Sequence, residues 1–235
     1  MRKLAVVTGG TKGIGRATVE KFLAEGFDVV TCARKQQDLE QLVTDLKTAY
    51  PEGHIWAEQA DLSQKEQVLA FAEVVKSLDR PVDVLLNNTG VFIPGSVYDE
   101  EEGSLELMIE TNLYSAYYLT RALIGNMIEH KTGHIFTTGS IAGIQAYANG
   151  GSYSISKFAL LGFTKALREE MKPHGIRVTS ILPGATYTAS WEGVDLPESR
   201  FMKSSDIADA IYGAHALSAN TVVEEIVLRP QLGDI

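Results

Sequence analysis

The sequence predicts an α/β fold in which a doubly wound parallel sheet of about seven strands carries helices on both faces. Short apolar runs alternate with helical patterns along the whole chain, which is typical of βα units joined by right-handed crossovers. A glycine-rich turn follows the first apolar run. The length of 235 residues, 45% of them hydrophobic, suits one α/β domain with a large core. We therefore expect a single domain over residues 1–235.

The elements follow one another in a regular order. The expected strands are Leu4–Val7, Val29–Cys32, His54–Ala57, Val82–Leu86, His134–Thr138, Val178–Leu182 and Glu225–Leu228. Apolar periodicity between them predicts helices at 14–25, Gln36–Tyr50, Ser63–Leu78, Ser104–His130, Tyr153–Lys172 and Ser205–Leu217. The stretch Pro183–Lys203 is long and irregular. Because long loops in compact domains are usually functional, we expect a short substrate loop at about residues 185–204.

The turn after the first strand has the composition of a phosphate site. Its sequence is TGGTKGIG, residues 8–15, and a helical pattern follows it. Glycines let the backbone approach a pyrophosphate, and a helix N-terminus offers free N–H groups and partial positive charge. The spacing is T-G-x-x-x-G-x-G rather than G-x-G-x-x-G. Taken alone, the turn also fits an ordinary strand-to-helix connection.

Tyr153 and Lys157 stand four residues apart on a predicted helix, which places them on one face about 5–6 Å apart. A phenol needs a pKa shift of about three units, or about 4 kcal/mol, to exchange protons near neutrality. A unit charge about 4 Å away supplies about that amount, before desolvation opposes it. We expect Lys157 to lower the pKa of Tyr153. Such a pair also occurs on helices without catalytic function.

Together these motifs resemble the short-chain dehydrogenase/reductase family over essentially the whole chain. Ser140 precedes Tyr153 by 13 residues, which is the family's usual interval. Thr89 stands where the family usually has alanine. The resemblance implies a Rossmann-type fold, a nicotinamide dinucleotide cofactor and carbonyl or alcohol chemistry. The matching residues are Thr8–Gly15, Asp61, Asn87–Gly90, Asn112, Ser140, Tyr153, Lys157, Pro183, Gly184 and Thr188.

The end of the second strand predicts the form of the cofactor. An acidic residue about 20 positions past the glycines favours NAD, and here Ala33 holds that position and Arg34 follows it. By resemblance, Lys12 occupies a position that is basic in NADP-preferring members. A guanidinium fork and an ammonium suit a 2′-phosphate, so we expect NADPH or NADP. The alternative is that both cations are solvated surface groups.

The resemblance also implies the residues that contact the cofactor. Asp61 and Leu62 would flank the adenine, and Asp61 could also cap the following helix. Asn87 and Gly90 would flank the adenosine ribose. The full predicted set is Gly9, Thr11, Lys12, Gly13, Ile14, Gly15, Arg34, Asp61, Leu62, Asn87, Gly90, Tyr153, Lys157, Pro183, Gly184, Thr186 and Thr188.

Four residues would carry the catalysis by resemblance. Tyr153 would donate the proton during carbonyl reduction, and Ser140 would orient the substrate oxygen. Lys157 would hold the nicotinamide ribose, and Asn112 would hold a water linking Lys157 to solvent. We therefore predict an NADPH-dependent carbonyl reductase. A 3-oxoacyl-(acyl-carrier-protein) reductase, a hydroxy-acid dehydrogenase and a non-enzymatic NADP-binding sensor are the alternatives.

Composition excludes several classes of partner. The net charge of −9 argues against a nucleic acid or an anionic membrane surface. No apolar run approaches the roughly 18 residues of a membrane helix. The single cysteine, Cys32, suits a reducing compartment, so we expect a cytoplasmic protein. His130 and His134 do not form a metal motif, and we expect both on the surface without a metal site.

Apolar and aromatic residues are expected to line a substrate pocket for a medium-sized ketone or diketone. They are Val91, Phe92, Ile93, Ile141, Ile144, Tyr147, Tyr187 and Trp191. The resemblance further implies a homodimer or homotetramer that pairs the helices at Ser104–His130 and Tyr153–Lys172. The residues consistent with that contact are Tyr117, Tyr118, Phe158, Leu161 and Phe163.

Overall fold

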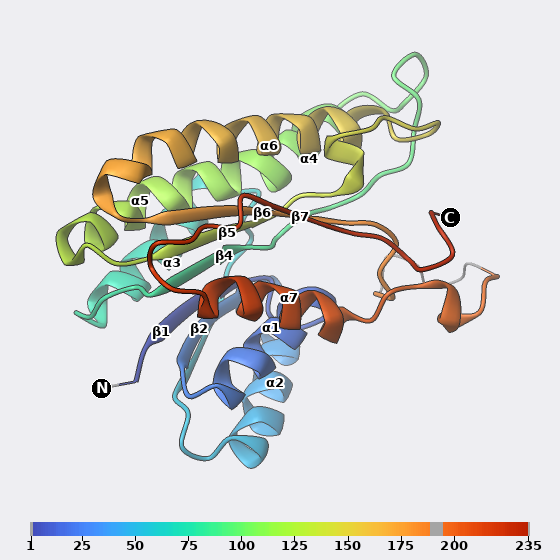
Figure 1. The fold of residues 1–235 in the computed structure, drawn as a ribbon. Helices are drawn as coiled ribbons and strands as arrows, with labels where there is room; N and C mark the ends of the chain where they lie inside the picture. The colour runs from blue at the N-terminus through green and yellow to red at the C-terminus, as the bar shows by residue number, and fades with distance from the viewer. Residues whose placement is uncertain (1, 189–194, 235) are drawn as a thin grey trace.

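A computed structural model, which describes residues 2–188 and 195–234, contains a seven-stranded parallel sheet (Figure 1). The strand order is β3-β2-β1-β4-β5-β6-β7, so the chain winds outward from β1 and then outward again from β4. This order confirms the doubly wound class. The strands are β1 (Leu4–Thr8), β2 (Asp28–Ala33), β3 (Ile55–Gln59), β4 (Val84–Asn87), β5 (His134–Thr138), β6 (Arg177–Pro183) and β7 (Glu225–Leu228).

The helices match the predicted pattern except at one place. They are α1 (Gly13–Ala24), α2 (Gln36–Ala49), α3 (Lys65–Ser77), α4 (Ser104–Ile109), α5 (Ser115–His130), α6 (Gly151–Met171) and α7 (Ser204–Ala216). A π-helical turn, η1 (Glu110–Tyr114), separates α4 from α5, so the uninterrupted helix predicted for this stretch was wrong. Short 3-10 turns lie at η2 (Ile141–Gly143), η3 (Lys172–His174) and η5 (Glu198–Arg200).

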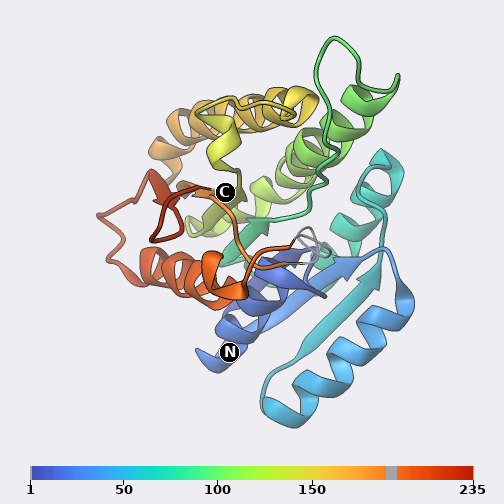
Figure 2. The ribbon, with the colours of Figure 1, turned by 90° about the vertical axis from the view of Figure 1, so that its right-hand side faces the viewer.

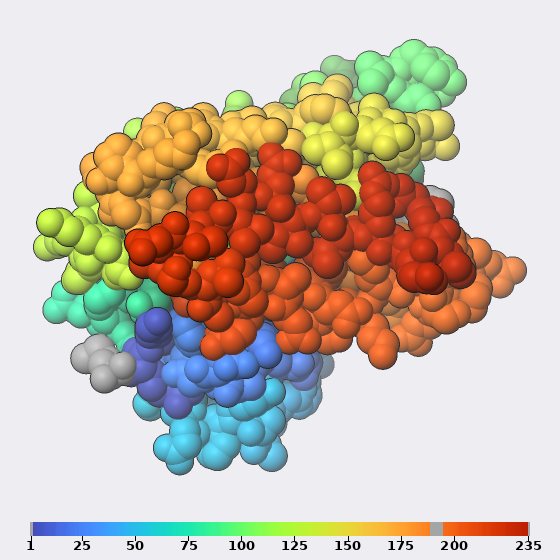
Figure 3. All heavy atoms as spheres, in the orientation of Figure 1, coloured from blue at the N-terminus to red at the C-terminus, as the bar shows by residue number. Residues whose placement is uncertain are grey.

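Alternating side chains of the central strands enter two separate cores. Leu4 and Val6 of β1 pack toward α3, α5 and α6, whereas Ala5 and Val7 pack toward α1, α2 and α7. Figures 1 and 2 show these two helix layers on opposite faces of the sheet. In Figure 3, the segments from α7 to the C-terminus lie between α6 and α1 on the visible surface. The fully buried strands are typical of a parallel sheet covered on both sides.

The strands β1 and β4 meet at the point where the winding direction reverses, and a hydrogen-bond cluster fixes their carboxyl ends. The Thr8 hydroxyl oxygen accepts the backbone N–H groups of Asn88 (2.8 Å) and Thr89 (3.0 Å). The Asn88 amide in turn donates to the Thr8 carbonyl oxygen at 3.0 Å. Ligands of open α/β sheets bind outside the carboxyl ends of the strands, at the point where the winding direction reverses. The crevice between β1 and β4 is therefore the expected ligand site.

His134 corrects one expectation from the sequence. His130 is exposed as predicted, but His134 is fully buried at the start of β5. Its ring stacks on Phe136 with the centroids 3.9 Å apart, and its Nε2 lies 2.8 Å from Thr179 Oγ1. Burial lowers the pKa of His134 to about 2, so the ring is neutral. The sequence did not indicate this burial, because the hydrogen-bond partner that satisfies the His134 ring lies on another strand.

Candidate active site

The glycine-rich turn between β1 and α1 has a backbone that larger residues do not fit. Gly9 and Gly13 have φ angles of +67° and +55°, which L side chains rarely adopt. A β-carbon on Gly15 would lie 2.1 Å from the Gly9 carbonyl oxygen. Helix α1 has no side-chain cap and no acidic residue in its first turn. Its first N–H groups are therefore available to an anion, which fits the predicted pyrophosphate cradle.

The segment after β6 reaches back to this turn. The Thr188 methyl carbon would lie 2.9 Å from a β-carbon placed on Gly13. Gly184 follows the last residue of β6, Pro183, and donates its N–H to the Leu228 carbonyl oxygen at 2.8 Å. The Thr186 hydroxyl donates to the Gly184 carbonyl oxygen at 3.1 Å. The structure thus brings Thr188 to the glycine-rich turn. Trp191 lies outside the described residues.

Two cations lie near the end of β2. Ala33 is the last residue of that strand, and Arg34 is exposed. Within the described residues the Arg34 guanidinium forms no ion pair. Lys12 Nζ lies 3.3 Å from Asp38 Oδ2, and its side chain is 62% exposed. Among residues 2–188 and 195–234, this corner therefore offers a guanidinium without an ion pair and a weakly held ammonium, since exposed ion pairs stabilise proteins by about 0–1 kcal/mol.

The predicted adenine and ribose contacts are only partly accessible. Asp61 Oδ1 accepts the Ser63 N–H (3.1 Å) and hydroxyl (2.9 Å), so Asp61 closes a local turn and does not cap α3, which begins at Lys65. Leu62 is 3% exposed and belongs to the core. Its side chain is therefore turned away from the crevice.

Asn87 ends β4, and Gly90 lies in the segment that follows it. Asn87 is buried, and its amide nitrogen donates to Thr120 Oγ1 at 2.9 Å. Gly90 is exposed. A β-carbon on Gly90 would lie 3.2 Å from Asn112 Oδ1 and 3.4 Å from Lys157 Nζ. The absence of a side chain at Gly90 therefore leaves open the surface next to two predicted catalytic residues.

Tyr153 and Lys157 share one face of α6, as their spacing predicts. Lys157 is 4% exposed, and its Nζ lies 5.6 Å from the centre of the Tyr153 ring. The same ammonium donates to the Thr138 carbonyl oxygen at 2.9 Å. Ser140 follows β5, and its hydroxyl oxygen accepts the Ala142 N–H at 3.1 Å. Lysine and tyrosine are thus held together at the carboxyl end of β5.

Asn112 is fixed by three hydrogen bonds. Its Oδ1 accepts the Val91 N–H at 2.7 Å, and its Nδ2 donates to the Val91 carbonyl oxygen (3.0 Å) and to Ser156 Oγ (2.9 Å). The side chain is 1% exposed. Asn112 therefore joins three parts of the site: the π-turn, the segment after β4 and helix α6.

Desolvation is the largest influence on the pKa values of Tyr153 and Lys157. Desolvation raises the pKa of Tyr153 to about 12, and hydrogen bonding to the Ser140 side chain opposes this only in part. Desolvation also lowers the pKa of Lys157 to about 8. The prediction that Lys157 lowers the pKa of the Tyr153 phenol was therefore wrong, because desolvation has the largest effect and raises that pKa. Lys157 is buried and Tyr153 is half-buried, so the charged form of each group is poorly solvated, and the ammonium hydrogen-bonds the Thr138 carbonyl oxygen rather than the phenol.

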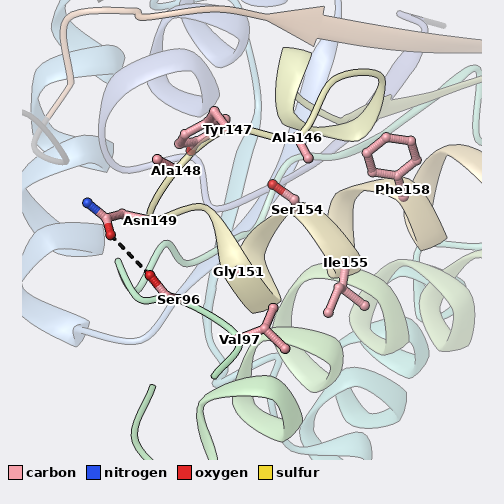
Figure 4. A pocket seen from close by; sticks show the side chains of 10 residues that line it. All are labelled: Ser96, Val97, Ala146, Tyr147, Ala148, Asn149, Gly151, Ser154, Ile155 and Phe158. Atoms are coloured by element: carbon pink, nitrogen blue, oxygen red, sulfur yellow. Dashed lines mark hydrogen bonds between the residues drawn. The ribbon is translucent and has the colours of Figure 1, made fainter. Parts of the chain in front are cut away.

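A hollow of about 520 Å³ adjoins the site but does not contain the catalytic pair (Figure 4). Its helical wall is made by Gly151, Ser154, Ile155 and Phe158, which form one face of α6. Tyr153 and Lys157 lie on the opposite face. Its remaining lining residues are Ser96, Val97, Ala146, Tyr147, Ala148 and Asn149.

Two predicted pocket residues lie near Tyr153, the candidate proton donor. The Phe92 ring meets the Tyr153 ring edge-on with the centroids 4.9 Å apart. The Tyr147 phenol lies close enough to raise the pKa of Tyr153 slightly. Both are aromatic groups near the Tyr153 phenol.

Known proteins resemble this chain along almost its full length. The family model described as short chain dehydrogenase matches residues 3–198. The chain belongs to the short-chain dehydrogenase/reductase family. It is an oxidoreductase of that family, as its glycine-rich turn and the Tyr153/Lys157 pair had indicated.

Three relatives illustrate the range of this similarity. A sepiapterin reductase of Chlorobaculum tepidum is 32% identical, covering 100% of this chain and 99% of its own. A 3alpha-hydroxysteroid dehydrogenase of Mediterraneibacter gnavus is 33% identical, covering 96% and 94%. The crystal structure of a metagenomic short-chain oxidoreductase in complex with NADP is 31% identical, with a TM-score of 0.85 and 97% coverage of both chains.

The part of the chain that the structure describes shows neither a membrane-spanning helix nor a cluster of metal-binding side chains. Within residues 2–188 and 195–234, no helix is long and apolar enough to cross a membrane. The same ranges contain no group of three or more histidine, cysteine or acidic side chains placed to hold a metal ion.

Sequence reasoning missed several residues that hold the site together. The Thr138 carbonyl and the Ser156 hydroxyl bind Lys157 and Asn112, but a backbone carbonyl and a helical serine carry no motif. Glu100 contacts the first turn of α6. It belongs to the acidic run Asp99–Glu102, which has the composition of a solvated loop.

Proposed function

We propose that this protein is an NADPH-dependent carbonyl reductase that uses Tyr153 as general acid. The observation that carries the proposal is the pairing of half-buried Tyr153 with buried Lys157 beside Ser140. Two cores share one sheet, which supports a single dinucleotide-binding domain over residues 1–235 with a substrate loop at about 185–204. When bound, the cofactor would supply the hydride, while the protein supplies position and a proton.

The residues present fit NADPH. In the turn where a pyrophosphate would approach, a β-carbon on Gly10, Gly13 or Gly15 would lie less than 3.0 Å from a neighbouring atom. Arg34 and Lys12 would hold the 2′-phosphate, and Ala33 provides no carboxylate to repel it. The NADP complex of the metagenomic relative supports the same assignment. Thr188 lies beside Gly13 of the proposed pyrophosphate turn, and the segment that carries Thr186 and Thr188 would continue from there toward the nicotinamide.

The protonation states suit reduction. With a pKa near 12, Tyr153 carries its proton at neutral pH and can donate it to a carbonyl oxygen. Lys157 is charged below its pKa of about 8 and would stabilise the phenolate that remains. Ser140 would hold the substrate oxygen in line. Both side-chain N–H groups of Asn112 already donate hydrogen bonds. The water that would link Lys157 to solvent would therefore bind an oxygen atom of Asn112.

The substrate proposal rests on the aromatic groups around Tyr153. Phe92 and Tyr147 favour a medium-sized ketone or diketone over a sugar. Under this proposal a 3-oxoacyl carrier and a hydroxy acid remain competing substrates. The experiment is a panel of ketones, diketones, 3-oxoacyl thioesters and hydroxy acids, assayed by cofactor absorbance with NADPH and NADH. NADPH binding without turnover on any member would favour the sensor alternative.

A second copy of the chain is the proposed partner at the outer face of α4 to α6. Leu107, Tyr114, Ile155 and Phe158 are each between 41% and 46% exposed there. Such an apolar face suits the pairing of helices in a homodimer or homotetramer. Sedimentation equilibrium would determine the state. A monomer at micromolar concentration would contradict the proposal.

A further inference from the structure

Glu100 lies in the segment between β4 and α4 and turns away from its acidic neighbours. Its Oε2 accepts the Ser152 N–H at 3.3 Å, and its Oε1 accepts the Ser152 hydroxyl. Ser152 is 1% exposed and directly precedes Tyr153. Glu101 and Glu102, by contrast, are exposed, and no side-chain hydrogen bond or ion pair of either occurs within the described residues.

The backbone around Glu100 lies directly against the start of α6. Gly95 donates its N–H to the Asn149 carbonyl oxygen at 3.1 Å, and Gly95 bridges Gly150 in parallel. The Ser96 hydroxyl donates to Asn149 Oδ1 at 3.3 Å, as the dashed line in Figure 4 shows. A β-carbon on Gly151 would lie 2.7 Å from the Gly95 carbonyl oxygen. Figure 1 shows this segment passing beside the first turn of α6.

The same segment touches the catalytic tyrosine. We name residues 91–100 the 91–100 loop. At one end Asn112 holds Val91 by two hydrogen bonds, and at the other Glu100 holds Ser152. Between these ends, Phe92 packs edge-on against the Tyr153 ring. The loop is therefore fastened on both sides of the phenol.

Helix α6 needs such a partner because it lacks its own cap. Gly150, which directly precedes α6, provides no side-chain cap, and the first turn of α6 contains no acidic residue. A carboxylate at a helix N-terminus satisfies free N–H groups and complements the helix dipole. Glu100 provides both from another part of the chain.

We propose that Glu100 is a positioning residue that fixes Tyr153 by joining the 91–100 loop to Ser152 in the first turn of α6. The inference rests on the proposed function, because it takes Tyr153 as the proton donor. Removal of the carboxylate should let the loop and the first helical turn move separately. Small displacements of a catalytic group reduce rates by about 10- to 100-fold.

The test compares Glu100→Ala, Glu100→Gln and the matched control Glu102→Ala. We expect Glu100→Ala to lower kcat about 10-fold or more while the Kd for NADPH stays within about twofold, since the loop does not form the phosphate cradle. Glu100→Gln should retain most activity, because its amide can accept the Ser152 N–H and donate to the hydroxyl. Glu102→Ala should match the wild type. Glu100→Ala combined with Ser152→Ala should be no slower than Glu100→Ala alone.

Amide hydrogen exchange provides a readout that does not need activity. Glu100→Ala should exchange faster than Glu102→Ala in residues 91–100 and 151–154. Unchanged exchange, or a lower thermal midpoint with kcat unchanged, would overturn the inference. If the wild type reduces no carbonyl with NADPH, the proposed function fails, while the exchange comparison still decides whether Glu100 joins the two segments.

Discussion

Lys157→Met should stabilise the fold at neutral pH while removing catalysis. Lys157 is buried on α6, and desolvation lowers the pKa of its ammonium from 10.5 to about 8. Since one pH unit corresponds to about 1.4 kcal/mol, holding this charge inside costs about 3 kcal/mol below pH 8. Methionine has a similar length and carries no charge. It leaves the Thr138 carbonyl without its donor, a loss of about 1–2 kcal/mol.

The expected net stabilisation is therefore about 1–2 kcal/mol at pH 7. For a chain of this length, that corresponds to a rise in Tm of about 2–8 °C. Between pH 8 and 10.5, Lys157 is protonated in the unfolded protein but has lost its proton in the folded protein. The free energy of unfolding of the wild type therefore rises with pH in this window. The advantage of the variant should shrink through this window and reverse above it. Tyr153 titrates in both proteins, so its contribution largely cancels.

Thermal and urea unfolding from pH 7 to 10.5 would measure the difference. Lys165→Met is the matched control, because Lys165 lies on the same helix with its side chain 51% exposed. It should change stability little and without this pH dependence. The reasoning fails if Lys157→Met is less stable than the wild type at pH 7. It also fails if the difference between the two proteins is constant over the whole pH range.

Three further outcomes are expected. Tyr153→Phe should bind NADPH normally and turn over about 10²-fold more slowly or worse in stopped-flow assays, and near-normal turnover would refute its role as acid. Arg34→Ala should weaken NADPH binding about 10- to 100-fold and leave NADH unchanged, and Ala33→Asp should shift preference toward NADH; equal use of both cofactors by the wild type would contradict this. The folded pKa of His134, about 2, lies below its ordinary value of 6.5, so below pH 6.5 the unfolded state binds the extra proton. Urea titrations should show a loss of about 1.4 kcal/mol per pH unit that His134→Leu lacks, and equal slopes would refute it.

The sequence was sufficient for the sheet because parallel strands are continuous apolar runs. All seven expected strands occur, with the start of β4 at Val84 rather than Val82 as the largest shift at a strand start. The glycine-rich turn and the Tyr153/Lys157 face were also predictable, because both depend on local spacing.

Properties set by tertiary packing were not predictable. The pKa of Tyr153 depends on how completely water is removed around it, and spacing alone favoured the opposite direction. Glu100 and its exposed neighbour Glu102 have the same local composition, and only the path of the 91–100 loop separates their surroundings. His134 was misjudged for the same reason, because its partner Thr179 lies on another strand.

The π-turn between α4 and α5 contains Asn112, so the number of residues in this turn sets where Asn112 lies in the candidate site. The Ser115 N–H bonds the Glu110 carbonyl oxygen, five residues back, instead of the Thr111 oxygen four residues back. The Ser115 hydroxyl takes over that acceptor, donating to the Thr111 oxygen at 2.5 Å. The turn therefore holds one residue more than an α-helical turn does, and each residue advances an α-helix by about 100°. Deleting one residue here would restore an unbroken helix and swing Asn112 away from Val91, so chain length at this point fixes the geometry of the candidate site.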